Sequence, residues 1–288
     1  MAKNNLSQEQ IKEKLDNMIW SFSSVNCYNN CHRGFYLQYI EKKQKKLSNA
    51  FAQWGTLGHS ILERYYKGEA ELWDLKSIYE TEYPSAVTIQ FPYNKYADLS
   101  ENYYNAGLTY FENFQGDFEG CEILGVEQKV RLEIDGYQFV GYIDLIVRTP
   151  KGIIICDHKS KSALSKKEKP EYLRQLYLYS LYVKEQYGEY PYKLVFNMFR
   201  AGAWETEDFN EADLKKAKEW FTSTIQSAYQ DAQFKDKVAL DYTDKGKKLK
   251  DFKHDDYFCN YICSTPCLRS QRTKPSKPRW MRGDKRCS

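Results

Sequence analysis

The sequence predicts an α/β fold in which helices flank a central sheet, and three segments carry that prediction. Residues 141–159 read GYIDLIVRTPKGIIICDHK, two β-branched runs on either side of Thr149-Pro150-Lys151-Gly152. Pro and Gly in a four-residue break between such runs are typical of a β-hairpin. Residues 172–187 have the apolar spacing of a helix, and residues 193–199 (KLVFNMF) suit another strand.

The N-terminal part of the chain is predicted to be helical. Ser7 and Gln10 fit a capping box, so a short helix should begin at Gln8. A second helix should start near Cys31. Residues 55–66 (GTLGHSILERYY) predict a stronger one, because their apolar residues recur at helical spacing.

The middle and C-terminal parts supply the remaining elements. Residues 70–118 are predicted to be mainly helical, with loops around Pro84 and Pro92. A strand over 121–129 and a second strand leading into Asp144 should be joined at Asp135-Gly136, a hairpin turn signal. A long amphipathic helix is expected from residue 210 to about 232.

Composition indicates a folded, soluble protein. The chain has 288 residues, of which 42% are hydrophobic and 28% charged, enough for one large domain or two small ones. No apolar run approaches the roughly 20 residues of a membrane helix, and the N-terminus lacks a signal-peptide core. We therefore expect an intracellular, cytoplasmic protein without a membrane partner.

Charge is concentrated at the C-terminal end. The net charge is +4, yet residues 268–288 alone hold eight Lys/Arg and one acidic residue. This segment interleaves basic residues with Trp280, so it could pair with phosphates and stack on a base. A flexible, solubilising basic tail is the alternative.

The charged residues of the predicted hairpin indicate a metal site. Asp144 interrupts its first strand, and Asp157 and Lys159 close its second. Strand side chains alternate, so Asp157 and Lys159 project from the same face, with Asp144 within reach on the neighbouring strand. Such a grouping of charges would be unfavourable without a purpose, and binding of a divalent metal supplies one. A solvated strand end is the plainer interpretation of each residue taken alone.

Five short motifs, in this order, resemble the RecB-like branch of the PD-(D/E)XK nucleases. They are Gly58-His59, VEQKV around Glu127, GYIDLI around Asp144, IICDHKSKS around Asp157 and Lys159, and QLYLY from Gln175 to Tyr179. The resemblance spans roughly residues 20–270. Each motif alone is weak, whereas their order and spacing together are specific.

The resemblance implies a restriction-endonuclease-like fold, a mixed central sheet flanked by helices. Residues 1–267 would form one nuclease domain with a helical insertion at about 60–118 and a cysteine-cluster cap. Residues 268–288 would be the tail.

The resemblance also implies roles for named residues. Catalytic roles fall to Asp144, Asp157, Lys159, Gln175 and Tyr179. The metal ligands would be His59, Asp144 and Asp157, with Glu127 either supporting them or merely lying on the strand surface.

Carboxylates suit Mg²⁺ or Mn²⁺, and the His59 imidazole would shift the preference toward Mn²⁺. Lys159 would orient or help deprotonate a water and stabilise the phosphate in the transition state. Gln175 and Tyr179 would brace the site or contact the DNA backbone.

Eight cysteines in a chain expected to be intracellular favour metal or redox chemistry over disulfides. By resemblance to iron–sulfur nucleases of this branch, in which a cysteine precedes a CxRxFYL-like segment, Cys31 would join Cys259, Cys263 and Cys267 around a [4Fe-4S] cluster. The C-terminal spacing departs from the family's, so structural Zn²⁺ stays an alternative, and Cys27 or Cys287 could substitute as ligands. Cys121 and Cys156 are predicted to be small core residues.

The predicted function is metal-dependent hydrolysis of DNA, by resemblance exonucleolytic and on single strands or DNA ends, as in CRISPR-associated and phage exonucleases. The chain has no Walker A sequence, so a helicase would be a separate partner. The alternative is a nuclease-fold DNA-binding or assembly factor, in recombination or CRISPR adaptation, without significant cleavage. A thiol-based redox or zinc-regulatory protein is a third possibility that leaves the hairpin charges unexplained.

Overall fold

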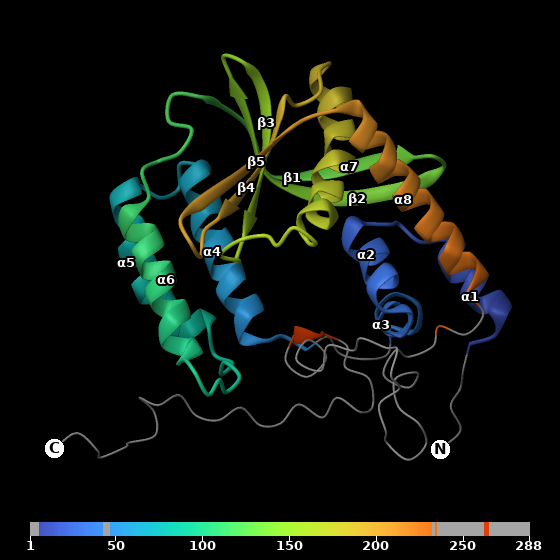
Figure 1. Ribbon diagram of the computed structural model, residues 1–288, viewed down its shortest axis with the longest axis horizontal. Helices are drawn as coiled ribbons and strands as arrows, with labels where there is room; N and C mark the ends of the chain where they lie inside the picture. The colour runs from blue at the N-terminus through green and yellow to red at the C-terminus, as the bar shows by residue number, and fades with distance from the viewer. Residues whose placement is uncertain (1–5, 43–46, 232–233, 235–261, 265–288) are drawn as a thin grey trace. The chain divides into compact units, whose positions relative to one another are not determined.

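A computed structural model describes residues 6–42, 47–231, 234 and 262–264 (Figure 1). These residues form two compact units. The first unit takes residues 6–42, 47, 131–141, 214–231, 234 and 262–264, and the second takes 48–130 and 142–213. In the part of the chain that the structure describes, no helix is long and apolar enough to cross a membrane. The predicted tail, 268–288, lies outside the described residues.

A five-stranded mixed sheet runs through the protein, as the sequence predicts. Its strands are β1 (Glu122–Ile134), β2 (Tyr137–Thr149), β3 (Gly152–Lys159), β4 (Lys193–Met198) and β5 (Ala203–Asp208), in the order β1-β2-β3-β4-β5. β2–β3 and β4–β5 pair antiparallel, whereas β3 and β4 pair parallel. β1 and β2 contribute residues to both units.

Both predicted hairpin turns are confirmed. Thr149 pairs with Gly152 at the β2–β3 turn, where Gly152 has a φ of 130° that favours glycine. At the β1–β2 turn, Asp135 and Gly136 have φ values of 50° and 86°, the positive values of a tight hairpin turn. β5 was not predicted, because AWETED is polar and carries no apolar alternation.

In the second unit the helices are α4 (Ala50–Tyr66), the 3₁₀ turn η2 (Leu72–Asp74), α5 (Leu75–Ala86), α6 (Leu99–Asn113) and α7 (Lys169–Tyr187). Helices α4, α5 and α6 lie side by side (Figure 1). Their buried aromatic and aliphatic side chains form one core with Leu145, Cys156 and Val195 of the sheet.

The sequence-based prediction of a loop around Pro84 is wrong. Pro84 lies within α5, two residues before its end. Tyr79 and Tyr83 of α5 pack against each other and against Tyr104 of α6, with ring centroids 4.9–5.9 Å apart. This packing stabilises the last helical turn of α5 despite the proline. Pro92 lies in the irregular segment between α5 and α6, as predicted.

Two glycines let α4 approach the carboxyl ends of β3 and β4. A Cβ at Gly58 would lie 2.6 Å from the Phe199 ring, and one at Gly55 would lie 3.2 Å from Ser160 Oγ. Real Cβ atoms are not found as close as the first of these distances, so Gly58 fixes how closely α4 packs. That close packing brings the next residue, His59, to the sheet end.

The first unit contains α1 (Gln8–Asp16), α2 (Phe22–Asn30), α3 (His32–Phe35), the π-helical η1 (Tyr36–Glu41) and α8 (Glu211–Gln230), of which residues from Leu214 onward belong to this unit. Ser7 and Gln10 form both hydrogen bonds of the predicted capping box. Trp20 bridges to the β2 backbone, and its ring stacks on Phe35 at 5.8 Å.

Candidate metal centre

Asp157 and Lys159 form a largely buried ion pair at the carboxyl end of β3. Asp157 is 4% exposed, and Lys159 Nζ lies 2.6 Å from Asp157 Oδ2. Both side chains project from the face on which Lys159 contacts α7, as the two-residue period of the strand predicts. Burial lowers the pKa of Lys159, but attraction to Asp157 and then Asp144 outweighs it and leaves that pKa above its usual value. Lys159 is therefore an ammonium at neutral pH.

Gln175 and Tyr179 of α7 hold the lysine in place. Lys159 Nζ donates to Gln175 Oε1 at 3.5 Å, and Gln175 Nε2 donates to Tyr179 Oη at 3.0 Å. Tyr179 is buried. The predicted sharing of one helix face by these two residues is thus observed.

Tyr172 is a neighbour that the sequence reasoning missed. The ammonium groups of Lys159 and Lys161 lie 4.9 and 5.1 Å from the centroid of its ring, distances at which a cation is attracted to an aromatic face. Tyr172 precedes Gln175 by three residues on the same helix, and that i, i+3 spacing was the available signal.

Asp144 lies on β2, next to the end of β3. Its Oδ2 accepts a hydrogen bond from the backbone N–H of His158 at 2.7 Å. Burial and then the charge of Asp157 raise the pKa of Asp144 to about 7, although His59 and Lys159 oppose the shift. The positive charges of His59 and Lys159 therefore do not fully offset the burial of Asp144 and its repulsion by Asp157.

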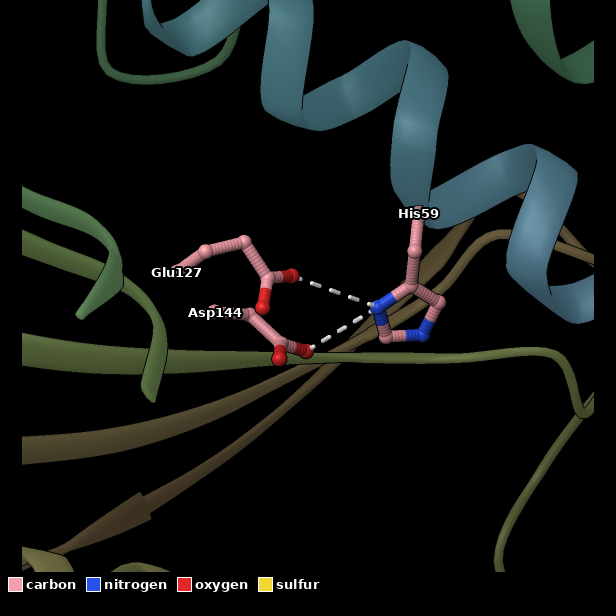
Figure 2. A group of neighbouring side chains, drawn as sticks. All are labelled: His59, Glu127 and Asp144. Atoms are coloured by element: carbon pink, nitrogen blue, oxygen red, sulfur yellow. Dashed lines mark ion pairs between the residues drawn. The ribbon is translucent and has the colours of Figure 1, made fainter. Parts of the chain in front are cut away.

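His59 and Glu127 complete the group (Figure 2). His59 Nδ1 lies 3.5 Å from Asp144 Oδ2 and 4.0 Å from Glu127 Oε1. Burial lowers the pKa of His59, but the neighbouring carboxylates of Glu127 and Asp144 leave it raised. One ligand atom from each of His59, Glu127 and Asp144 lies within 4.8 Å of the others.

The backbone of Glu127 explains how its side chain reaches this group. Glu127 has a φ of 48°, a left-handed conformation that costs a residue other than glycine free energy. Such a residue within a strand breaks the regular alternation and redirects a side chain, as in a β-bulge. Glu127 was predicted only as a possible support or strand-surface residue, and its inclusion here depends on a conformation that no sequence pattern revealed.

His158 projects to the face opposite Asp157 and Lys159, as predicted from strand alternation, and its ring lies edge-on to the His59 ring at 5.8 Å. Its ring stacks on Tyr66 of α4 at 5.9 Å, and its Nδ1 lies 3.1 Å from Asn197 Nδ2. Burial lowers the pKa of His158 well below its usual value, so the ring is neutral.

The donor atoms fit a divalent cation. Carboxylate oxygens and one imidazole are the ligands of Mg²⁺ and Mn²⁺ sites. The buried Asp157 Oδ2 has Lys159 beside it but accepts no well-formed hydrogen bond, so it keeps unused acceptor capacity. Of the three predicted ligands, the structure brings His59 and Asp144 together with Glu127, while Asp157 pairs with Lys159 instead of joining that trio.

Comparison with known proteins agrees with this chemistry. The chain matches the PD-(D/E)XK nuclease superfamily over residues 19–266. It belongs to this superfamily. The mixed sheet flanked by helices is accordingly a restriction-endonuclease-like fold, and the chain is a nuclease of a group that uses divalent metals.

A solved structure titled "Crystal structure of SSO0001" is 16% identical, with 75% of this chain and 85% of that chain covered and a TM-score of 0.31. None of the curated proteins compared with the chain matches it.

The predicted cysteine ligands are only partly within the described residues. Cys31 caps α3, where its Sγ accepts from Gly34 N at 3.3 Å. Cys27 Sγ lies close to the same glycine, 3.9 Å from where its Cβ would be. Cys263 is half-buried, and Cys259 and Cys267 lie outside the described residues.

Cys121 and Cys156 follow their prediction as small core residues. Cys156 is fully buried, and Cys121 packs partly buried against the same core.

Asp144 should make the metal-free protein less stable as pH rises. Its folded-state pKa of about 7 exceeds the unfolded value of about 3.9, so the folded state holds the proton over this window and loses stability as it is removed. In EDTA, Asp144→Asn should therefore raise the melting temperature. The gain should grow between about pH 4 and 7, reaching on the order of 3 °C.

Glu168→Gln is the matched control of opposite sign. Lys161 and Ser165 lower the pKa of Glu168 to about 2, so its contribution is present above the unfolded value and is lost as pH falls. This variant should lower the melting temperature at pH 7. An Asp144→Asn gain that is independent of pH would contradict the electrostatic account.

Proposed function

We propose that this chain is a metal-dependent deoxyribonuclease whose centre is built from His59, Glu127, Asp144, Asp157 and Lys159. One observation carries the proposal. In a chain of the PD-(D/E)XK nuclease superfamily, carboxylates from two paired strands meet an imidazole and an ammonium at one end of the sheet. The stability of the fold does not require so many charged groups in a site with so little exposure to solvent.

His59, Glu127 and Asp144 would hold the cation, with Asp157 as a further ligand. Bound there, Mg²⁺ or Mn²⁺ would lower the pKa of water and offset charge on the scissile phosphate. The Glu127 and Asp144 carboxylates raise the pKa of His59 and so favour the protonated imidazole. Because an imidazole binds a metal in its neutral form, binding of a cation should release this proton.

Lys159 would act as a charge and not as a base. Because its pKa lies above the usual value, Lys159 keeps its proton at neutral pH beside Asp157. An ammonium can donate a hydrogen bond to the attacking water and stabilise negative charge that develops on the phosphate. Gln175 would hold the ammonium in position, and Tyr179 would hold Gln175.

DNA is the proposed substrate, cut exonucleolytically on single strands or at ends. Support comes from the resemblance of the motifs to RecB-like exonucleases, including CRISPR-associated and phage enzymes. A helicase, recombination or CRISPR adaptation protein would act as a separate partner in the cytoplasm.

We further propose a [4Fe-4S] cluster on Cys31, Cys259, Cys263 and Cys267. Support comes from the CHRGFYL segment and from the half-buried position of the Cys31 thiol at the N-terminus of α3. Protein purified without oxygen should be brown and contain about four iron atoms per chain. Cys31→Ser should lose colour and iron, whereas Cys121→Ser should keep both; a colourless protein with stoichiometric zinc would refute the cluster.

Asp157→Asn tests the proposed centre. It should reduce DNA hydrolysis by at least about 100-fold with either Mg²⁺ or Mn²⁺, since it removes a charge beside the reacting phosphate. The matched control is Asp208→Asn, at a carboxylate of the same unit that is 85% exposed and pairs with Lys193. End-labelled single strands, linear duplexes and closed circles should serve as substrates, because an exonuclease leaves the circles intact.

Two outcomes would contradict the proposal. Unchanged hydrolysis in Asp157→Asn would refute the centre. Absence of hydrolysis by the unmutated protein, together with retained DNA binding, would favour the DNA-binding or assembly factor.

A further inference from the structure

A groove of about 770 Å³ lies at the carboxyl ends of β3 and β4 in the second unit. α6 forms one wall. The segments that follow the two strands, at Ser162 and at residues 200–204, contribute the other. β3 and β4 are a parallel pair, and ligands in α/β sheets commonly bind outside the carboxyl ends of such strands.

The groove lining adjoins the backbone at the end of β3, where Lys159 lies. Phe199 N donates to the Lys159 carbonyl at 3.2 Å, and the next residue, Arg200, lines the groove. Ser162 follows Lys159 by three residues, which span at most about 11 Å. A DNA strand whose phosphate lies near Lys159 can therefore place a neighbouring nucleotide in the groove.

The groove lining is rich in amides and nearly neutral. Side-chain amides come from Asn102, Asn105, Asn113 and Gln115. Among the described residues that line it, Arg200 and Asp117 carry the only charges, one of each sign. A phosphate-binding channel would instead carry an excess of Lys and Arg.

The two charged groups and the indole suit a planar, hydrogen-bonding ligand. Arg200 is already engaged by Tyr103, with its Nη1 2.8 Å from the Tyr103 hydroxyl and its guanidinium over the ring. Asp117 is half-buried and forms no salt bridge with any residue that the structure describes, and burial raises its pKa. Trp204 packs edge-on against Phe118 at 5.5 Å, with its ring only half-buried.

We propose that this groove binds an unpaired nucleobase of the DNA strand that occupies the metal centre. Amides and the Asp117 carboxylate match the donors and acceptors on the Watson–Crick edge of a base, and Trp204 offers a surface for stacking. A base-paired nucleotide has that edge occupied, so the groove selects single strands over duplex. This inference rests on the proposed function and adds to it the part of the substrate recognised next to the cut.

Binding measured in EDTA separates the groove from catalysis. The probe is a 5′-labelled single-stranded oligonucleotide followed by fluorescence anisotropy. Trp204→Ala and Asn105→Ala should each weaken binding about 5- to 20-fold. Trp73→Ala is the matched control, because Trp73 is 77% exposed on η2 and does not line the groove. Asn105 is exposed on α6, where alanine favours the helix, so this variant tests the groove even if Trp204→Ala misfolds.

An abasic scan of the oligonucleotide identifies the base itself. Removing one base at a time should weaken binding to the unmutated protein at one position. At that position the loss should be smaller in Asn105→Ala than in the unmutated protein, because base and side chain belong to the same interaction.

Each result decides between the claims. Groove variants that bind like the unmutated protein, or an unmutated protein that binds no single strand, would overturn the groove. If the unmutated protein still hydrolyses DNA and Asp157→Asn does not, the proposed function stands without the groove.

Discussion

The ion pair between Asp157 and Lys159 is the interaction on which the rest of the centre depends. A buried carboxylate and ammonium cost free energy to desolvate, and their mutual attraction offsets that cost only when the geometry is close. At 2.6 Å the pair is close, yet Asp144 beside it has a raised pKa, so positive charge remains in short supply. A divalent cation is the natural partner for such an excess of carboxylate.

The surrounding fold holds these charges where they are. Parallel pairing of β3 with β4 buries the strand end, and α7 supplies Gln175 and Tyr179 to fix the lysine. On the other face, His158 and Asn197 close the sheet end with neutral groups, while Gly58 lets α4 bring His59 to the site. The fold thus holds together a group of charged side chains that lowers its stability and is useful only when a ligand is bound.

The sequence could predict the parts of the centre that depend on local periodicity. Two-residue alternation placed Asp157 and Lys159 on one face and His158 on the other, and helical spacing placed Gln175 with Tyr179. Glu127 could not be placed in the same way, because its position depends on a single left-handed residue within β1. β5 and the groove escaped prediction for a related reason. They arise where polar segments distant in sequence come together, and polar segments carry little periodic signal.

Binding of Mn²⁺ followed by electron paramagnetic resonance tests the central claim most directly. Free Mn²⁺ has a strong signal that falls on binding, so a titration measures both affinity and stoichiometry. The account predicts one tight equivalent per chain, weakened about 10- to 100-fold by His59→Ala and by Asp144→Asn but unchanged by Glu168→Gln. Binding that is absent in the unmutated protein, or unaffected by either ligand substitution, would contradict it.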